Sequence, residues 1–165
     1  MNIFVTDENP RVCAENLDDK RVIKMVLESA QILSTAVTLN GGQGMYKPTH
    51  TGHPCVQWAA ECYENWLWLF NHMMALHNEF KIISGGKTHL SFRKVMDSKL
   101  IHEAYKFLDR DKDRTPFVNC AGNKSLGLDY TDMTDVHKAY QLYLNDRWDR
   151  DIRRPIWSRN GQRRI

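Results

Sequence analysis

One carboxylate surrounded by cations is the most informative pattern in the sequence, and it falls in residues 18–31. Wound on a helix at about 100° per residue, the charged and amide side chains of this stretch share one arc of about 100°. They are Lys20, Arg21, Lys24, Glu28 and Gln31. Two interpretations remain open: a solvated ion-pair cluster, or an acid/base group within an anion-binding site. In the second case Glu28 acts as a general base or stabilises a developing cation, while the neighbouring cations hold phosphates.

Two histidines in the loop Pro48–Pro54 offer a second kind of chemistry. His50 and His53 precede a predicted helix at a spacing seen among metal ligands, but no third ligand follows at a recognisable spacing and no HExxH motif is present. We therefore expect neither a metal site nor a cofactor. A histidine at a helix N-terminus can instead contact a phosphate or protonate a leaving group, so His53 is a catalytic candidate and His50 a phosphate-binding one.

The segment Gly85-Gly86-Lys87-Thr88 is similar to the end of a phosphate-binding loop. That motif needs a glycine five positions before Gly86, and this position is Lys81. The end of a helix explains both glycines. Lys87 remains a candidate for contact with an anion.

The C-terminal stretch combines arginines with tryptophans. Residues 146–165 hold seven arginines and three aspartates, a balance of +4, so the remaining residues sum to −1 within the net charge of +3. Such a stretch suits neutralisation of a phosphate backbone and stacking on bases. The candidates are Arg147, Arg150, Arg153, Arg154 and Trp157. The alternative is a solubilising tail whose tryptophans pack on the core and whose arginines stay in water.

Helices must position these groups, because apolar residues follow helical spacing through most of the chain. Helices are predicted at about residues 10–17, 18–39, 54–83, 91–108 and 134–148, after a short extended segment at 2–6. Residues 115–133 have no clear period and are predicted to be a loop. The prediction is an all-α protein: a compact single-domain helical bundle of about five helices, covering 1–165, with a basic tail from about residue 146 to 165.

Composition restricts the class of protein. The chain has 165 residues, of which 42% are hydrophobic, and this excludes a disordered protein. No uninterrupted apolar run approaches the roughly 18 residues of a membrane span, and the N-terminus lacks a signal-peptide pattern. Four cysteines without a CxxC pair fit a reducing compartment and argue against a zinc ribbon. We expect a cytoplasmic protein without membrane contact.

Two resemblances extend this interpretation. The residues Met1–Phe4, Asp19–Gln31 and the Pro48–Pro54 loop resemble a group of small tailed-phage proteins, which implies a viral protein acting in the host cytoplasm. The chain also resembles the pyrimidine-dimer DNA glycosylases of the phage endonuclease V type, which are compact all-α proteins that act without metal. That family carries a histidine seven residues before a catalytic glutamate, and Arg21 and Glu28 stand at this spacing here. Gly52-His53 and the basic aromatic C-terminus are similar to further stretches of the family.

The second resemblance implies a base-excision enzyme that acts on damaged or modified pyrimidines in double-stranded DNA with an extruded base. It implies catalysis by Glu28 and phosphate contacts by the cations around it. The family attacks the sugar C1′ with a free N-terminal amine, usually after removal of the initiator methionine. This chain begins Met1-Asn2, and asparagine disfavours that removal, so we expect base release through Glu28 and water.

Two other functions remain open on the sequence alone. One is a transferase that modifies pyrimidines in phage DNA. The other is a small phage protein that binds an anionic nucleotide or a host factor in the basic arc. The sequence leaves the oligomeric state undetermined.

Overall fold

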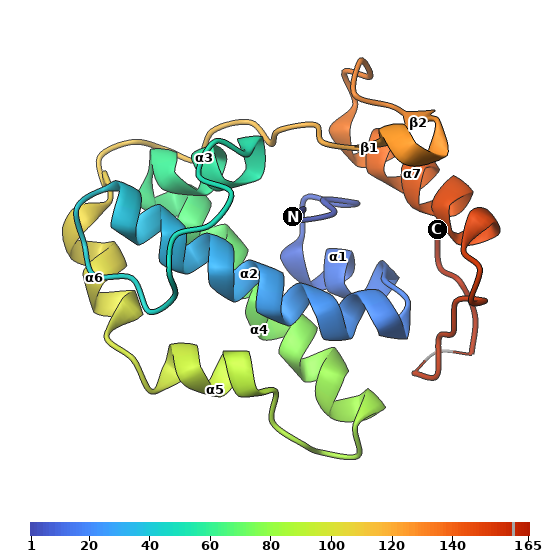
Figure 1. The fold of residues 1–165 in the computed structure, drawn as a ribbon, viewed down its shortest axis with the longest axis horizontal. Coiled ribbons are helices and arrows are strands. Elements are labelled where there is room, and N and C mark those ends of the chain that lie inside the picture. The colour runs from blue at the N-terminus through green and yellow to red at the C-terminus, as the bar shows by residue number, and fades with distance from the viewer. Residues whose placement is uncertain (160) are drawn as a thin grey trace.

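The computed structural model describes residues 1–159 and 161–165, and most of these residues are helical (Figure 1). Asn160, which falls in the predicted basic tail, lies outside the described residues. The described residues form seven α-helices: α1 (Pro10–Asn16), α2 (Asp19–Leu39), α3 (Pro54–Glu61), α4 (Tyr63–Ile83), α5 (Leu90–Met96), α6 (Leu100–Phe107) and α7 (Val136–Arg150). The predicted mostly helical class is confirmed, whereas the predicted number of helices is too low.

Two predicted helices are each divided in the structure. Cys62 adopts an extended conformation, with φ −160° and ψ 165°, and separates α3 from α4. The break is stable because a backbone group beside it is hydrogen-bonded outside the helix: Tyr63 N–H donates to the Asp109 carbonyl at 2.7 Å. Residues 97–99 separate α5 from α6, where the Ser98 hydroxyl accepts a hydrogen bond from Leu100 N–H at 3.1 Å and so serves as a local cap. Hydrophobic periodicity continues across both breaks, which is why the sequence pattern misses them.

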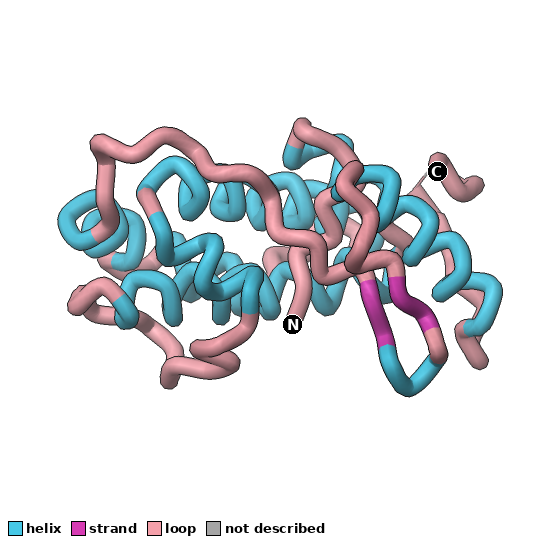
Figure 2. The backbone as a smooth tube through the Cα atoms, turned by 90° about the horizontal axis from the view of Figure 1, so that it is seen from above, coloured by secondary structure: helices cyan, strands magenta, loops and turns pink. Residues whose placement is uncertain are grey.

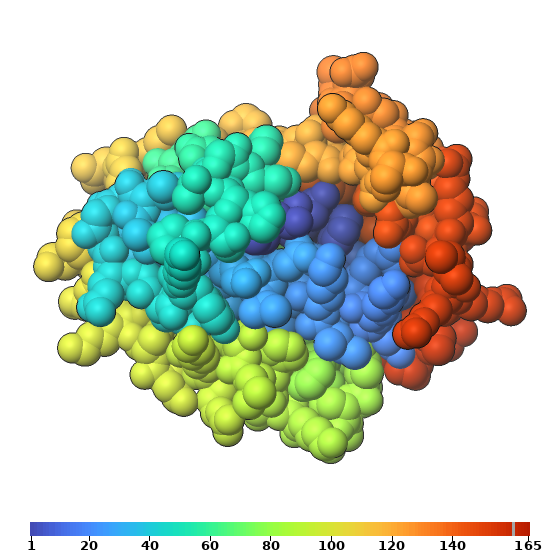
Figure 3. Space-filling view, viewed as in Figure 1, coloured from blue at the N-terminus to red at the C-terminus, as the bar shows by residue number. Residues whose placement is uncertain are grey.

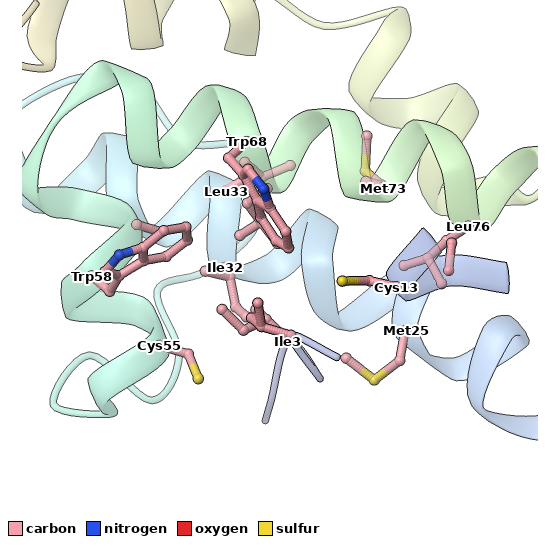
Figure 4. Packing of buried hydrophobic residues seen from close by; sticks show 14 of the residues in the cluster. Ile3, Cys13, Met25, Ile32, Leu33, Cys55, Trp58, Trp68, Met73 and Leu76 are labelled. Carbon is pink, nitrogen blue, oxygen red and sulfur yellow. The ribbon is translucent and has the colours of Figure 1, made fainter. Parts of the chain in front are cut away.

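The core lies where α2 crosses α4 (Figure 4). Trp66 is fully buried on α4, and its indole N–H donates to the Leu33 carbonyl of α2 at 3.0 Å. α2 is long enough and apolar enough to span a membrane, which the sequence analysis did not predict. The mean hydropathy of its most apolar window is 1.4. Because 67% of that window is buried inside the protein, packing accounts for its apolar character. Not every apolar side chain of α2 is buried, since Ile23 is 41% exposed.

A long extended segment, residues 108–121, connects α6 to the far side of the molecule (Figure 2). Thr115 fixes it to the helices, since its N–H donates to Asn65 Oδ1 at 2.9 Å and its carbonyl accepts from the Trp58 indole at 3.3 Å. The segment leads into a two-stranded antiparallel hairpin, β1 (Gly122–Asn123) and β2 (Leu128–Asp129), joined by the short 3-10 helix η1 (Lys124–Leu126). This hairpin falls within the predicted loop at 115–133. It lies beside α7 and close to the N-terminus (Figure 1).

Candidate active site

A pocket of about 330 Å³ opens where the first half of α2 meets the N-terminus, β1 and α7. Figure 3 shows this hollow, with the N-terminal residues in dark blue at its floor. α2 contributes five side chains to its wall. Met25 is apolar, and the other four belong to the polar arc: Lys20, Arg21, Lys24 and Glu28. Arg147 of α7 adds a further cation. The fold therefore brings the α2 arc, the chain start and part of the C-terminal basic stretch to one place.

Glu28 is the central acid of the pocket, and its side chain is 12% exposed. Its Oε1 lies 2.9 Å from Lys24 Nζ, an ion pair between residues one helical turn apart. Its Oε2 accepts a hydrogen bond from the Asn2 N–H at 3.1 Å and lies 3.7 Å from the α-amine of Met1. The carboxylate thus joins a lysine of its own helix to the terminal amine in a site largely shielded from water.

The N-terminal segment folds back to bring this amine to Glu28. Asn2 Nδ2 donates to the Cys120 carbonyl at 3.1 Å, and Asn2 Oδ1 accepts from the N–H groups of Ile3 and Phe4. Phe4 has a φ of +45°, in the left-handed region that a bulky residue rarely adopts. Thr6 N–H closes the bend on the Phe4 carbonyl at 2.9 Å. Strain of this kind persists only where surrounding contacts impose it, and here they fix the position of the chain start.

Aromatic rings form one side of the pocket. The Phe4 ring is stacked on Tyr143 of α7, with centroids 6.3 Å apart and planes 16° apart. It also meets the fully buried Tyr140 edge to face at 6.2 Å. A half-buried, flat apolar surface therefore lies close to the carboxylate and the amine, an arrangement that suits a planar ligand.

Arg21 has a different environment from the other cations of the arc. Its guanidinium is 10% exposed and is paired with Asp18 at 2.7 Å and Asp151 at 3.0 Å. Asp18 also accepts from the Trp148 indole N–H at 2.8 Å. These contacts connect the start of α2 to the end of α7. Arg21 therefore lines the pocket as part of a buried ionic network.

A second hollow of about 360 Å³ continues the basic surface, because Lys20 and Arg147 line both. Its other cations are Arg150 and Arg153. Arg150 Nη1 donates to the Leu126 carbonyl at 2.7 Å, which fixes the hairpin against α7. The two hollows together form a basic groove with Glu28 in its first part. Six cations line it: Lys20, Arg21, Lys24, Arg147, Arg150 and Arg153.

His53 is the N-cap of α3, and its Nδ1 accepts from Cys55 N–H at 3.2 Å. Burial lowers the pKa of His53, and the positive terminal amine and His50 lower it further. His50 itself is exposed and bonded to the Thr49 hydroxyl at 2.7 Å. His53 does not line the pocket.

The remaining candidates lie away from the pocket. Gln31 is half-buried on α2, and Lys87 is exposed in the turn that follows α4. Arg154 and Trp157 line a separate hollow, where the Trp157 ring packs edge to face on Trp148 at 5.0 Å. Trp157 therefore contacts the protein itself.

Sequence reasoning missed the residues that complete the pocket from outside α2. Asn2 and Phe4 lie in the Met1–Phe4 stretch that resembles the phage proteins, but the sequence assigned no role to either side chain. Tyr143 carries no motif, and Asn123 lies in a stretch without period. The terminal amine was suggested only by the family resemblance. Asp151, the second partner of Arg21, is separated from it by 130 residues, so no local pattern reveals the pair.

Comparison with known proteins places the first half of the chain in a family. A family model described as pyrimidine dimer DNA glycosylase matches residues 1–89. No curated protein and no solved structure gives a match. The matched residues include the terminal amine and Glu28, whereas the hairpin, α7 and the basic C-terminal stretch lie outside them.

Proposed function

The chain belongs to the pyrimidine dimer DNA glycosylase family, and on that premise we propose that the Glu28 pocket is its active site. The family is one of glycosylase/lyase enzymes, so the protein is a base-excision enzyme whose substrate is DNA with damaged pyrimidines. The observation that carries the assignment of the site is the position of the Met1 amine, 3.7 Å from a carboxylate that is 12% exposed. A nucleophile and an acid/base group are thereby adjacent in one pocket.

The proposed nucleophile is the amine beside Glu28 and not the water expected from the sequence, because the Met1 amine lies 3.7 Å from Glu28 Oε2 and the family is one of glycosylase/lyase enzymes. In the chain as it begins here this is the Met1 amine, and if Met1 is removed it is the nitrogen of Asn2, already 3.1 Å from Glu28 Oε2. The amine attacks C1′ of the damaged nucleotide, and the bond between C1′ and the base breaks with its electron pair leaving on the base. Glu28 accepts the proton that the amine loses and returns a proton to the sugar ring oxygen as the ring opens. The product is an iminium between C1′ and the amine, from which loss of a C2′ proton expels the 3′ phosphate.

The cations along the groove are proposed to hold the phosphates on both sides of the target nucleotide. Lys20 and Arg147 line both hollows, and Arg150 and Arg153 extend the surface away from Glu28. An enzyme that reacts at C1′ must take its target out of the base stack. We propose that the duplex is bound with one nucleotide extruded, and that the stacked pair of Phe4 and Tyr143 receives a base.

The test uses a labelled duplex with one cyclobutane pyrimidine dimer at a defined position and the same duplex without damage. Base release and strand cleavage are measured for the wild type and for Glu28→Gln. We expect cleavage at the dimer by the wild type alone, with a loss of about 10²-fold or more in the variant. Glu15→Gln is the matched control, because Glu15 is also shielded (19% exposed) and ion-paired but lies outside the pocket.

Equal activity of Glu28→Gln and the wild type would remove Glu28 from the mechanism. Cleavage of the undamaged duplex at the same rate would contradict the specificity for a damaged pyrimidine.

A further inference from the structure

Three side chains with soft or imidazole ligand atoms meet behind the pocket. They are His53, Cys55 and Cys120, and their ligand atoms all lie within 4.8 Å of one another. Cys55 is fully buried, while His53 and Cys120 are half-buried. His53 and Cys55 come from the start of α3, and Cys120 comes from the end of the 108–121 segment, so the tertiary fold brings them together.

This donor set matches the coordination chemistry of zinc. Zinc is bound tetrahedrally by cysteine sulfurs and histidine nitrogens, and two cysteines with one histidine form a known three-ligand set whose fourth position is open. Bond lengths of about 2.3 Å to sulfur and about 2.0 Å to nitrogen place the ligand atoms of such a site about 3.5–3.8 Å apart. The separations in the cluster must therefore shorten by at most about 1.0–1.3 Å, which is within the reach of side-chain rotation.

The Tyr140 hydroxyl lies beside the cluster. Tyr140 is fully buried, and its hydroxyl accepts a hydrogen bond from the Cys120 N–H at 3.2 Å. Contacts of this kind orient the ligands of a metal site. Two thiols held close together can bind a divalent cation as thiolates, and metal binding releases their protons.

We propose that His53, Cys55 and Cys120 form a zinc-binding site. Ligation by His53 exchanges its 3.2 Å hydrogen bond with Cys55 N–H for a metal bond. The exchange leaves the Cys55 N–H without its cap. The first residue of α3, Pro54, has no N–H that needs a cap. In the sequence, His50 and His53 alone did not provide enough ligands for a metal site. The structure supplies the other ligands from Cys55 and from a residue 65 positions further on, Cys120.

The zinc would act on the position of the chain start. The Cys120 carbonyl accepts a hydrogen bond from Asn2 Nδ2 at 3.1 Å, and Asn2 N–H contacts Glu28. A metal that joins Cys120 to α3 would thus fix the segment that carries the amine. This consequence rests on the proposed function, whereas metal binding itself does not.

The test is the zinc content of the full chain, produced in zinc-supplemented medium, reduced and dialysed, and measured by elemental mass spectrometry. We expect about one zinc per chain in the wild type, and a content lower by about tenfold or more in Cys55→Ser and in Cys120→Ser. The chain offers matched controls, because Cys13 and Cys62 are also buried free thiols but lie outside the cluster. Cys13→Ser and Cys62→Ser are expected to retain the metal.

A second measurement covers the case in which the ligand variants fail to fold. Cobalt(II) added to the reduced wild type is expected to give the thiolate-to-cobalt charge-transfer absorption of a site with two sulfur ligands. A wild type without zinc and without this absorption overturns the proposal, as does a Cys55–Cys120 disulfide recovered from the metal-free protein. Zinc retained equally by all four variants also overturns it. None of these readouts depends on DNA cleavage, so the proposal can fail while the assignment of Glu28 stands.

Discussion

Glu28 has two positive neighbours of different origin, and they give it two different tasks. Lys24 belongs to the same helix and is 67% exposed, so it can contact a phosphate and the carboxylate at once. The Met1 amine belongs to a residue whose side chain is only 3% exposed, so the chain start is held in place. At 3.7 Å the amine and the carboxylate form an ion pair, and a closer approach or one bridging water would allow a proton to pass between them. At the scale of single residues, the proposed chemistry therefore needs only these two partners and the aromatic surface beside them.

The aromatic surface leads to a prediction for Phe4→Leu, which keeps the apolar contact and removes the flat ring. Stacking of a base on an aromatic side chain contributes about 1–3 kcal/mol. We expect kcat/KM on the dimer duplex to fall by about tenfold or more, while the free energy of unfolding changes by less than about 1.5 kcal/mol. Steady-state cleavage and urea denaturation measure the two quantities.

Tyr105→Leu serves as the comparison, because Tyr105 is a 52% exposed ring on α6, away from the pocket. An unchanged kcat/KM in Phe4→Leu would show that the ring does not receive a base.

At the scale of elements, the helices predicted from the sequence agree with the structure where their ends carry local signals. α1 begins at Pro10 after the cap Asn9, and α2 covers Asp19–Leu39, both as predicted. The break at Cys62 is stabilised by a distant partner, the Asp109 carbonyl, which no local pattern reveals. The break at residues 97–99 has a local cap in Ser98, but hydrophobic periodicity continues across it. The same limit applies to the site: the α2 arc could be predicted, whereas Asn2, Tyr143 and Asp151 reach it only through tertiary packing.

From the ionic network that joins α2 to α7 we predict that Arg21→Gln is strongly destabilising. Removal of the Arg21 guanidinium leaves Asp18, which is 1% exposed, without its positive partner. Breaking a buried pair in this way costs about 3–5 kcal/mol of unfolding free energy. Arg11→Gln removes an ion pair whose arginine is 80% exposed, and exposed pairs contribute about 0–1 kcal/mol.

Urea denaturation of both variants measures the difference. If Arg21→Gln were as stable as Arg11→Gln, the network would not hold α7 to α2. Arg21 would then be free to act on the substrate.

His72 of α4 predicts a loss of stability in acid. Its Nδ1 is bonded to the Pro10 carbonyl at 2.9 Å, and burial lowers its pKa from 6.5 to about 4. Between these values the unfolded chain binds a proton that the folded chain does not, so stability falls as the pH drops below 6.5. The loss between about pH 7.5 and about pH 5 is expected to be about 2 kcal/mol.

His72→Asn retains a donor near the Nδ1 position and removes the titration. The fall in unfolding free energy over the same pH range is therefore expected to be smaller in this variant. Identical pH profiles for the two proteins would contradict the role of His72.

At the scale of the whole molecule, the proposed DNA-binding groove extends away from the proposed site of chemistry. Its two adjoining hollows are formed largely by α2, α7 and the chain after α7, while the carboxylate and the amine lie at one end. The family match covers the end with the chemistry, and the groove extends into the half of the chain beyond it. Affinity for DNA and cleavage of DNA are thus expected to respond to different substitutions.

Salt dependence tests this separation. Arg153→Gln is expected to weaken binding to damaged and undamaged duplexes alike, and to reduce the slope of log K against log salt by about one. Lys87→Gln removes a cation that lies outside the groove and is expected to leave the slope unchanged. Fluorescence anisotropy over a series of salt concentrations measures both slopes. An equal effect of the two variants would mean that binding depends on net charge rather than on the groove.

The most direct test of the central claim is to trap the enzyme on its substrate. Borohydride reduces an iminium to a stable amine, so a reaction with the dimer duplex in its presence is expected to give a covalent protein–DNA adduct. Peptide mass mapping is expected to place the adduct on the N-terminal nitrogen, of Met1 or of Asn2, and Glu28→Gln is expected to form little of it. An adduct on a lysine side chain such as Lys24, or base release without any adduct, would contradict the account.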